Sequence, residues 1–438
     1  MNLRERVERA LERGDRAAAW AALDGAAPAD AGTATEGDAR DHALLVLAVG
    51  AHDPSHEGLA ERAAGLARTF AHDAEVAVAA CAALNAIAAR RPPDAPPREG
   101  GAEALALEVA DAALVGDPPV ELRAYLLVNR AQALRALGPE RDAEAVAAYG
   151  AAIVLAPDRG AWHFELGVLH KWRGRWDDAA LAFAEAKRHL GETRGVRWNE
   201  ALVATARGRG ADALEAWQAL GLAATRPEDA APDRLPQVPD LPPLRVRVPA
   251  KASGYGPPQD AEERRYEVVW VAPLTPGHGV VQSPTFDEAP IDYGDVVLWD
   301  GAPVAEEGVG LAGEPPRRVP VFPLLEILRR GDERRYRFVA QLAEGDLAAM
   351  MDALPGGCRA FAHGAPSEGL AYGKLVVPAG PDLKDVRARL EAVLAARRTL
   401  RFAIPGLYEA TADAKRAGLE HQAWRGIERR AGVRGADA

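Results

Sequence analysis

The chain has few of the residues that define small secreted or metal-bound proteins. Its 438 residues include only two cysteines, Cys81 and Cys358, which lie far apart in the sequence. Two separated cysteines provide neither a disulfide framework nor a thiolate metal site. We therefore expect no metal or other cofactor, and a reducing compartment, the cytoplasm.

Long apolar runs are also missing. Residues 1–7 are charged and amphipathic, without the unbroken apolar core of a secretory signal. Later apolar runs, such as 76–89, are too short and too rich in alanine to span a bilayer. Basic residues number 53 against 64 acidic ones, which gives a net charge of −11. A surface of this sign repels phosphate and anionic lipid, so we expect a bacterial cytoplasmic protein without nucleic-acid or membrane partners.

The composition changes along the chain. The first half is dominated by Ala, Leu, Glu and Arg, whereas the part after Pro227 is rich in Val, Pro, Gly and Tyr, a shift from helix formers to strand and turn formers. Six prolines between 227 and 243 prevent helix formation there. The sequence predicts a helical repeat domain at 1–222, a Pro-rich linker at 223–260 and an α+β domain at 261–438.

Large and small residues recur in the helical half at the spacing of one helix–turn–helix unit. The set consists of small, small, aromatic and apolar residues, and it repeats after 34 residues: Gly167, Ala179, Phe183 and Ala186, then Ala201, Ala213, Trp217 and Leu220. Upstream, the same slots hold Ala131, Ala145, Tyr149 and Ala152, with Pro157 at the exit, if Pro139 and Glu140 are a two-residue insertion. Small residues let two helix backbones approach closely, and each pair buries its apolar stripe only by stacking on the next.

Over residues 124–221 this pattern resembles the tetratricopeptide repeat (TPR) family. The resemblance implies an α-solenoid in which the first helices of successive pairs line a concave groove that binds a protein or peptide partner. The positions that the resemblance places in the groove are Asn129, Gln132, Arg135, Phe164, Val168, Lys171, Trp198 and Asn199. Where one TPR subgroup has a carboxylate clamp, this chain has Val128, Gln132, Glu165 and Gly195. The implied ligand is an apolar peptide with some negative charge, and the alternative occupant is the chain's own C-terminal half or linker.

The second half alternates β-like runs with helices. We expect strands at 266–271, 295–299 and 318–322 and a short helix at 324–330. The region 336–405 has a clearer order: strand 336–342, helix 346–354, strand 358–363, strand 369–377, helix 383–398 and strand 400–404. This βαββαβ order predicts a ferredoxin-like part, followed by an amphipathic helix at 409–430.

The irregular region 273–300 is the best candidate for catalytic chemistry. His278, oriented by Asp287 or Asp292, would form an acid–base pair. The competing interpretation is a turn at 292–295 whose aspartates accept hydrogen bonds from backbone amides. We favour the turn, because no Gly-flanked serine accompanies the histidine.

Taken together, these features predict a protein-interaction scaffold that acts through the TPR-like groove. Two alternatives remain: an enzyme with its site in the 273–300 region, and a small-molecule sensor that uses the ferredoxin-like sheet.

Overall fold

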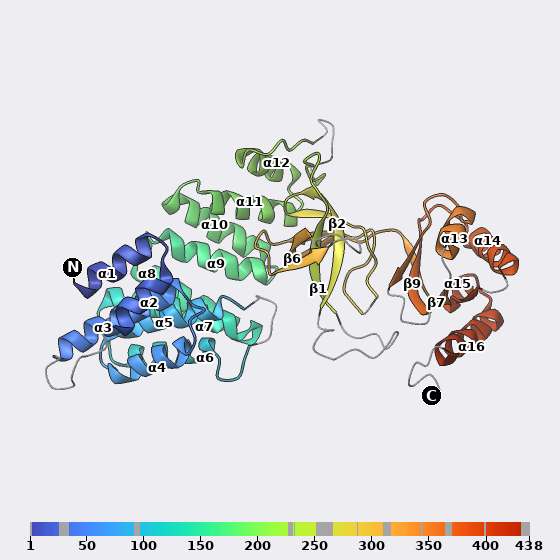
Figure 1. Cartoon of the computed structure of the whole chain (residues 1–438). Helices are drawn as coiled ribbons and strands as arrows, with labels where there is room; N and C mark the ends of the chain where they lie inside the picture. Colours follow the sequence, from blue (N-terminus) through green and yellow to red (C-terminus); the bar gives the residue numbers. More distant parts are fainter. Residues whose placement is uncertain are drawn as a thin grey trace. The chain divides into compact units, whose positions relative to one another are not determined.

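The computed structural model describes residues 2–25, 35–91, 97–226, 231, 233–250, 266–286, 288–309, 317–342, 345–363, 370–397 and 400–430. The chain forms two compact units, Met1–Arg207 and Gly208–Ala438. The first unit is helical, and every described strand belongs to the second (Figure 1). The chain is therefore mixed α and β, as its composition predicts. The division between units falls ahead of residue 222, where we expected the helical domain to end.

The first unit consists of helices that pack mainly against their neighbours in sequence. Their bounds are α1 Leu3–Glu12, α2 Arg16–Asp24, α3 Glu36–His52, α4 Leu59–Thr69, α5 Ala74–Ala88, α6 Ala102–Val115, α7 Val120–Leu137, α8 Asp142–Leu155, α9 Gly160–Trp172, α10 Trp176–Leu190 and α11 Arg194–Ala206. The pairs α5–α6, α7–α8 and α9–α10 pack closely, and α5 also contacts α3 and α7. Each pair also contacts the next, since α6 packs on α7, α8 on α9 and α10 on α11.

Short polar signals set the ends of these helices. The Asp73 carboxylate caps α5 by accepting hydrogen bonds from the backbone amides of Glu75 and Val76. The Thr193 hydroxyl caps α11 in the same way. Helix α10 ends at Gly191, whose φ of +70° favours glycine. Glycine thus ends this helix where the TPR pattern has proline.

The repeat spacing corresponds to an interlocked pair of helices, α9 and α10. A Cβ at Gly167 of α9 would lie 2.7 Å from a ring carbon of Phe183 in α10. Ala179 and Ala186 on α10 are fully buried. Only a small residue fits at 167, as the alternation of small and large residues predicts. The next helix of the pattern, α12 (Gly210–Ala219), belongs to the second unit, and its Trp217 is fully buried.

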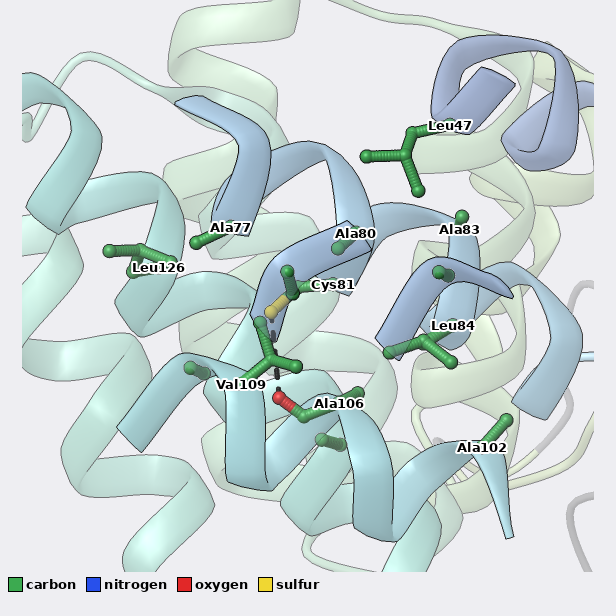
Figure 2. Packing of buried hydrophobic residues seen from close by; sticks show 14 of the residues in the cluster. Leu47, Ala77, Ala80, Cys81, Ala83, Leu84, Ala102, Ala106, Val109 and Leu126 are labelled. Atoms are coloured by element: carbon green, nitrogen blue, oxygen red, sulfur yellow. Dashed lines mark hydrogen bonds between the residues drawn. The ribbon is translucent and has the colours of Figure 1, made fainter. Parts of the chain in front are cut away.

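Alanine dominates the core between α5 and α6. Figure 2 shows Cys81 of α5 beside Ala106 and Val109 of α6, and the Cys81 thiol donates a hydrogen bond to the Ala106 carbonyl at 3.5 Å. Burial raises the pKa of Cys81 to about 12. Since the thiolate is the reactive form, Cys81 is a packing residue.

After α12, the second unit forms a small β-barrel. Its strands are β1 Leu244–Pro249, β2 Tyr266–Thr275, β3 His278–Val281, β4 Val296–Trp299, β5 Ala305–Val309 and β6 Arg317–Arg329. The order β1-β2-β3-β4-β6 is antiparallel, β1 also pairs with β6 in parallel and closes the sheet, and β5 extends β6. Alternate residues point inward, among them Val246, Val271 and Trp299, which are fully buried in the barrel core.

For two sequence ranges, the structure differs from the secondary structure that we predicted. The range predicted as linker, 223–260, contains β1 and an antiparallel bridge between Thr225 and Gln237; residues 227–230, 232 and 251–260 lie outside the described ranges. The predicted helix at 324–330 is wrong, because these residues continue β6, with Leu324 opposite Trp299 and Ile327 opposite Val297. A short apolar run fits the periodicity of a helix as well as that of a strand. Here the pairing with β4 makes it a strand.

The rest of the second unit has the predicted βαββαβ order. Its elements are β7 Arg334–Gln341, α13 Asp346–Ala353, β8 Arg359–His363, β9 Leu370–Val377, α14 Leu383–Ala396 and β10 Arg401–Ala403, followed by α15 Pro405–Ala410 and α16 Ala414–Arg430. The antiparallel strand order is β10-β7-β9-β8. One face of the sheet packs in a core with α13 and α14, and Val339 and Tyr372 on the other face pack against Trp424 of α16.

Within the described ranges, no helix is both long enough and apolar enough to cross a bilayer.

Candidate functional site

Polar side chains link the odd-numbered helices of the first unit, on which the predicted groove residues lie. Between α5 and α7, the Asn85 side-chain amide donates to the Asn129 carbonyl and Oδ1 at 3.0 and 3.1 Å. Between α7 and α9, Arg135 Nη1 donates to Glu165 Oε2 at 2.9 Å. Between α9 and α11, Lys171 Nζ donates to Asn199 Oδ1 at 2.9 Å. We call these three links the polar ladder.

The ladder changes the role of several predicted groove residues. Asn129, Lys171 and Asn199 are each buried, and the amides of Asn129 and Asn199 also donate to the backbone carbonyl four residues earlier, at Tyr125 and Gly195. Buried polar groups need partners, and these three residues find them within the helical unit. They therefore hold helices together, whereas Gln132 and Arg135 keep part of their surface exposed.

The apolar groove residues are half-buried. The Phe164 ring meets the Phe183 ring edge-on, with centroids 5.4 Å apart, and lies near Gly195 of α11. Val168 joins the same cluster of α9 and α10, and Trp198 is half-buried on α11. These side chains contribute to packing and still expose apolar surface.

Tyr149 lies behind the middle rung of the ladder. Its ring is fully buried, and its hydroxyl makes no hydrogen bond among the described residues. Burial raises the pKa of Tyr149, and the Arg135 charge opposes this effect.

A cavity of about 660 Å³ opens at one end of the N-terminal helices. It is lined by the start of α3, the turn between α4 and α5, and the start of α7. Arg40 lines it and pairs with Asp73 and Glu75. The charged groups of this cavity are therefore already paired with one another.

His278 in the second unit is a buried, neutral histidine. It opens β3 after a tight turn, and its Nδ1 lies 2.6 Å from Thr275 Oγ1. Burial lowers the pKa of His278 to about 4, and its Nε2 makes no hydrogen bond among the described residues. Its orienting partner is a threonine hydroxyl, whereas the acid–base hypothesis required an aspartate.

Asp292, the other described member of the predicted catalytic set, forms a turn. Its Oδ1 accepts hydrogen bonds from the backbone amides of Thr285 at 3.3 Å and Tyr293 at 2.8 Å, and its Oδ2 accepts from Lys374 of β9. No hydrogen bond or ion pair joins it to His278 within the described ranges. Asp287 lies outside those ranges. These contacts correspond to the turn interpretation.

Metal ligands do not gather in the part of the chain that the structure describes. No group of three or more His, Cys, Asp or Glu side chains there could hold a metal ion. Cys81 and Cys358 are both buried and belong to different units.

Two participants in these networks had no sequence prediction. Asn85 lies 44 residues before Asn129, which is not the repeat period, so the pattern did not reveal it. Lys374 interrupts the apolar strand Leu370–Val377, every residue of which is buried. A lysine within a buried strand implies a buried acceptor, and this signal was available in the sequence.

No protein-family model and no curated protein sequence matches this chain. Its class therefore follows from the fold and the site alone: a unit of stacked helix pairs joined by a polar ladder, followed by a unit that contains a β-barrel and a four-stranded βαββαβ sheet.

Proposed function

We propose that the protein is a scaffold or adaptor whose helical unit is a TPR-like solenoid that binds a protein or peptide partner. The observation that carries the proposal is the partly exposed apolar surface of Phe164, Val168 and Trp198 on α9 and α11. The polar ladder supports it, because buried hydrogen bonds fix the helices that present these side chains. A preorganised surface loses less entropy on binding.

The charges near this surface favour an apolar peptide that carries some negative charge. Arg135 and Glu165 are paired, and each keeps about a third of its side chain exposed. A carboxylate of the ligand would compete with Glu165 for Arg135 and gain a charge-assisted hydrogen bond. Aromatic and arginine side chains together are typical of interface hot spots. The chain's own C-terminal half remains the alternative occupant of the groove.

The C-terminal sheet belongs to the ferredoxin-like class in this proposal. The support is its strand order, β10-β7-β9-β8, with α13 and α14 in the core on one face. Such a module has no site of its own in the proposal and serves as the second part of a cytoplasmic adaptor.

The test uses the full-length chain and a phage-displayed random-peptide library. Clones selected on the wild-type protein are measured against a variant carrying Phe164→Ala and Trp198→Ala. We expect binding to weaken by about 2–4 kcal/mol, because truncating central aromatic residues costs this much at interfaces. The matched control is Leu181→Ala, which removes an apolar side chain that is 70% exposed on α10.

Two results contradict the proposal. One is equal binding of the selected peptides to the wild type and the double variant. The other is equal loss in Leu181→Ala, which would make the binding non-specific. Circular dichroism of each variant checks that helical content is retained.

A further inference from the structure

The acidic turn of residues 291–295, between β3 and β4 of the barrel, contacts the four-stranded sheet. Lys374 in the middle of β9 donates to Asp292 of this turn, a contact between residues 82 positions apart. Lys374 is only 6% exposed. A buried ammonium group needs a charged or polar partner, and Asp292 provides it from the other substructure.

Arg335 of β7 makes a second connection. Its Nε donates to the Tyr293 carbonyl at 3.1 Å, and its guanidinium also approaches Asp295 Oδ1 at 3.4 Å. The Tyr293 ring packs against Phe361 of β8, with centroids 5.4 Å apart. Three neighbouring strands of the sheet therefore contact the same turn.

Asp295 ties the turn to the chain segment that connects the two substructures. It is 1% exposed and accepts hydrogen bonds from the Gly331 amide at 2.9 Å, the Asp292 amide at 3.0 Å and Arg330 Nη1 at 3.0 Å. Gly331 lies in the connection 330–333 between β6 and β7. A Cβ at this position would lie 2.7 Å from the Gly294 backbone, so the connection and the turn are in direct contact.

The cationic side chains that contact the turn lie on one face of the sheet. One face of the sheet carries Arg335, Arg337 and Lys374. Alternate residues of β7 share a face, and Arg337 lies opposite Lys374 of β9. Helix α16 covers part of that face with apolar side chains. The acidic turn covers the cationic part, so its carboxylates are matched to the charges beneath them.

We propose that residues 291–295 are an electrostatic clasp that fixes the barrel and the four-stranded sheet as one body. Without the clasp, the connection 330–333 is a hinge between two separately folded substructures. In this proposal Asp292 positions the barrel against the sheet, because its carboxylate is already bound to Lys374. This inference is independent of the binding surface proposed for the helical unit.

Acetylation of lysines in the full-length chain tests the clasp. Mass spectrometry compares Lys374 with Lys384, which is exposed on α14 and serves as the internal reference. In the wild type, Lys374 reacts far more slowly than Lys384. In Asp292→Asn, we expect the Lys374 to Lys384 ratio to rise about tenfold or more, because local opening exposes the amine. The matched control is Arg397→Gln, which breaks the ion pair with Asp346 inside the sheet module. An unchanged ratio in Asp292→Asn, or an equal rise in Arg397→Gln, overturns the proposal.

A charge exchange distinguishes the clasp from a general loss of folding. Asp292→Lys and Lys374→Asp are made singly and together, and trypsin cleavage after Arg330 in the connection is followed. Each single variant places like charges together and speeds cleavage, and the double variant returns it toward the wild-type rate. If the double variant is cleaved as fast as the single ones, the Asp292 and Lys374 charges do not form a clasp.

Discussion

The two units of this protein differ in how far along the chain their contacts reach. In the helical unit, α7 packs on α8 and α9 on α10, so most contacts join neighbours in sequence. In the second unit, β1 pairs with β6, and Lys374 bonds to Asp292 across 82 positions. Sequence patterns report local contacts directly, whereas non-local pairs depend on the whole topology. Local patterns therefore predicted the close packing of α9 and α10, whereas the strand at 324–329 depended on its pairing with β4.

The largest expected effect tests whether the second unit depends on its non-local contacts. Asp295→Ala removes a buried carboxylate and leaves Arg335 without that partner. We expect a loss of about 3–5 kcal/mol, because the backbone amides of Asp292 and Gly331 lose their acceptor at this buried carboxylate. Denaturant unfolding followed by hydrogen exchange should place the loss in the second unit. The control, Asp385→Ala, removes an exposed helical pair with Arg389 and should change stability by less than about 0.5 kcal/mol. A loss that appears in the helical unit would contradict the division.

The second effect is a pH dependence that the second unit gains from one buried histidine. Burial lowers the pKa of His278 to about 4, against 6.5 for a free histidine. The unfolded state therefore takes up a proton before the folded state does. The free energy of unfolding has its full value above pH 6.5. It decreases by up to about 3 kcal/mol as the pH falls toward 4. His278→Gln should flatten this part of the stability profile. A variant with the same slope as the wild type between these pH values would show that other groups cause it.

The third prediction breaks the local packing of the helical unit. Gly167→Leu forces a side chain against Phe183 and should cost about 1–3 kcal/mol through overpacking. Gly150→Leu on α8 is the matched control, because no atom lies within 4 Å of its added Cβ. The measurement is thermal unfolding of the full chain, with hydrogen exchange to assign the affected unit. Equal effects of the two substitutions would mean that the close approach of α9 and α10 is unimportant.

The smallest effect concerns a single rung of the ladder. Asn85→Ala removes the amide that donates to Asn129 and should cost about 1 kcal/mol, the usual contribution of one hydrogen bond. Gln422→Ala, an exposed amide on α16, serves as the comparison and should be neutral. Denaturant midpoints of both variants are the measurement. A neutral Asn85→Ala would show that the ladder reflects packing and adds no stability.

The sequence by itself determined the parts whose contacts are local. The recurrence of Gly167, Ala179 and Phe183 predicted the interlocking of α9 and α10, because small and large residues on successive helices must match where they touch. The βαββαβ order also followed from local periodicity and turn residues. The shift in composition separated a helical from a strand-rich half.

The tertiary structure decided what local patterns leave ambiguous. Leu324 and Ile327 fit a helix or a strand, and pairing with β4 made them a strand. Asn129 and Asn199 fitted a groove, and partners on neighbouring helices buried them. Asp292 fitted a catalytic pair, and the structure brought it to Lys374. In each case the deciding partner lies on another element, and a buried polar or apolar group takes the position that satisfies it.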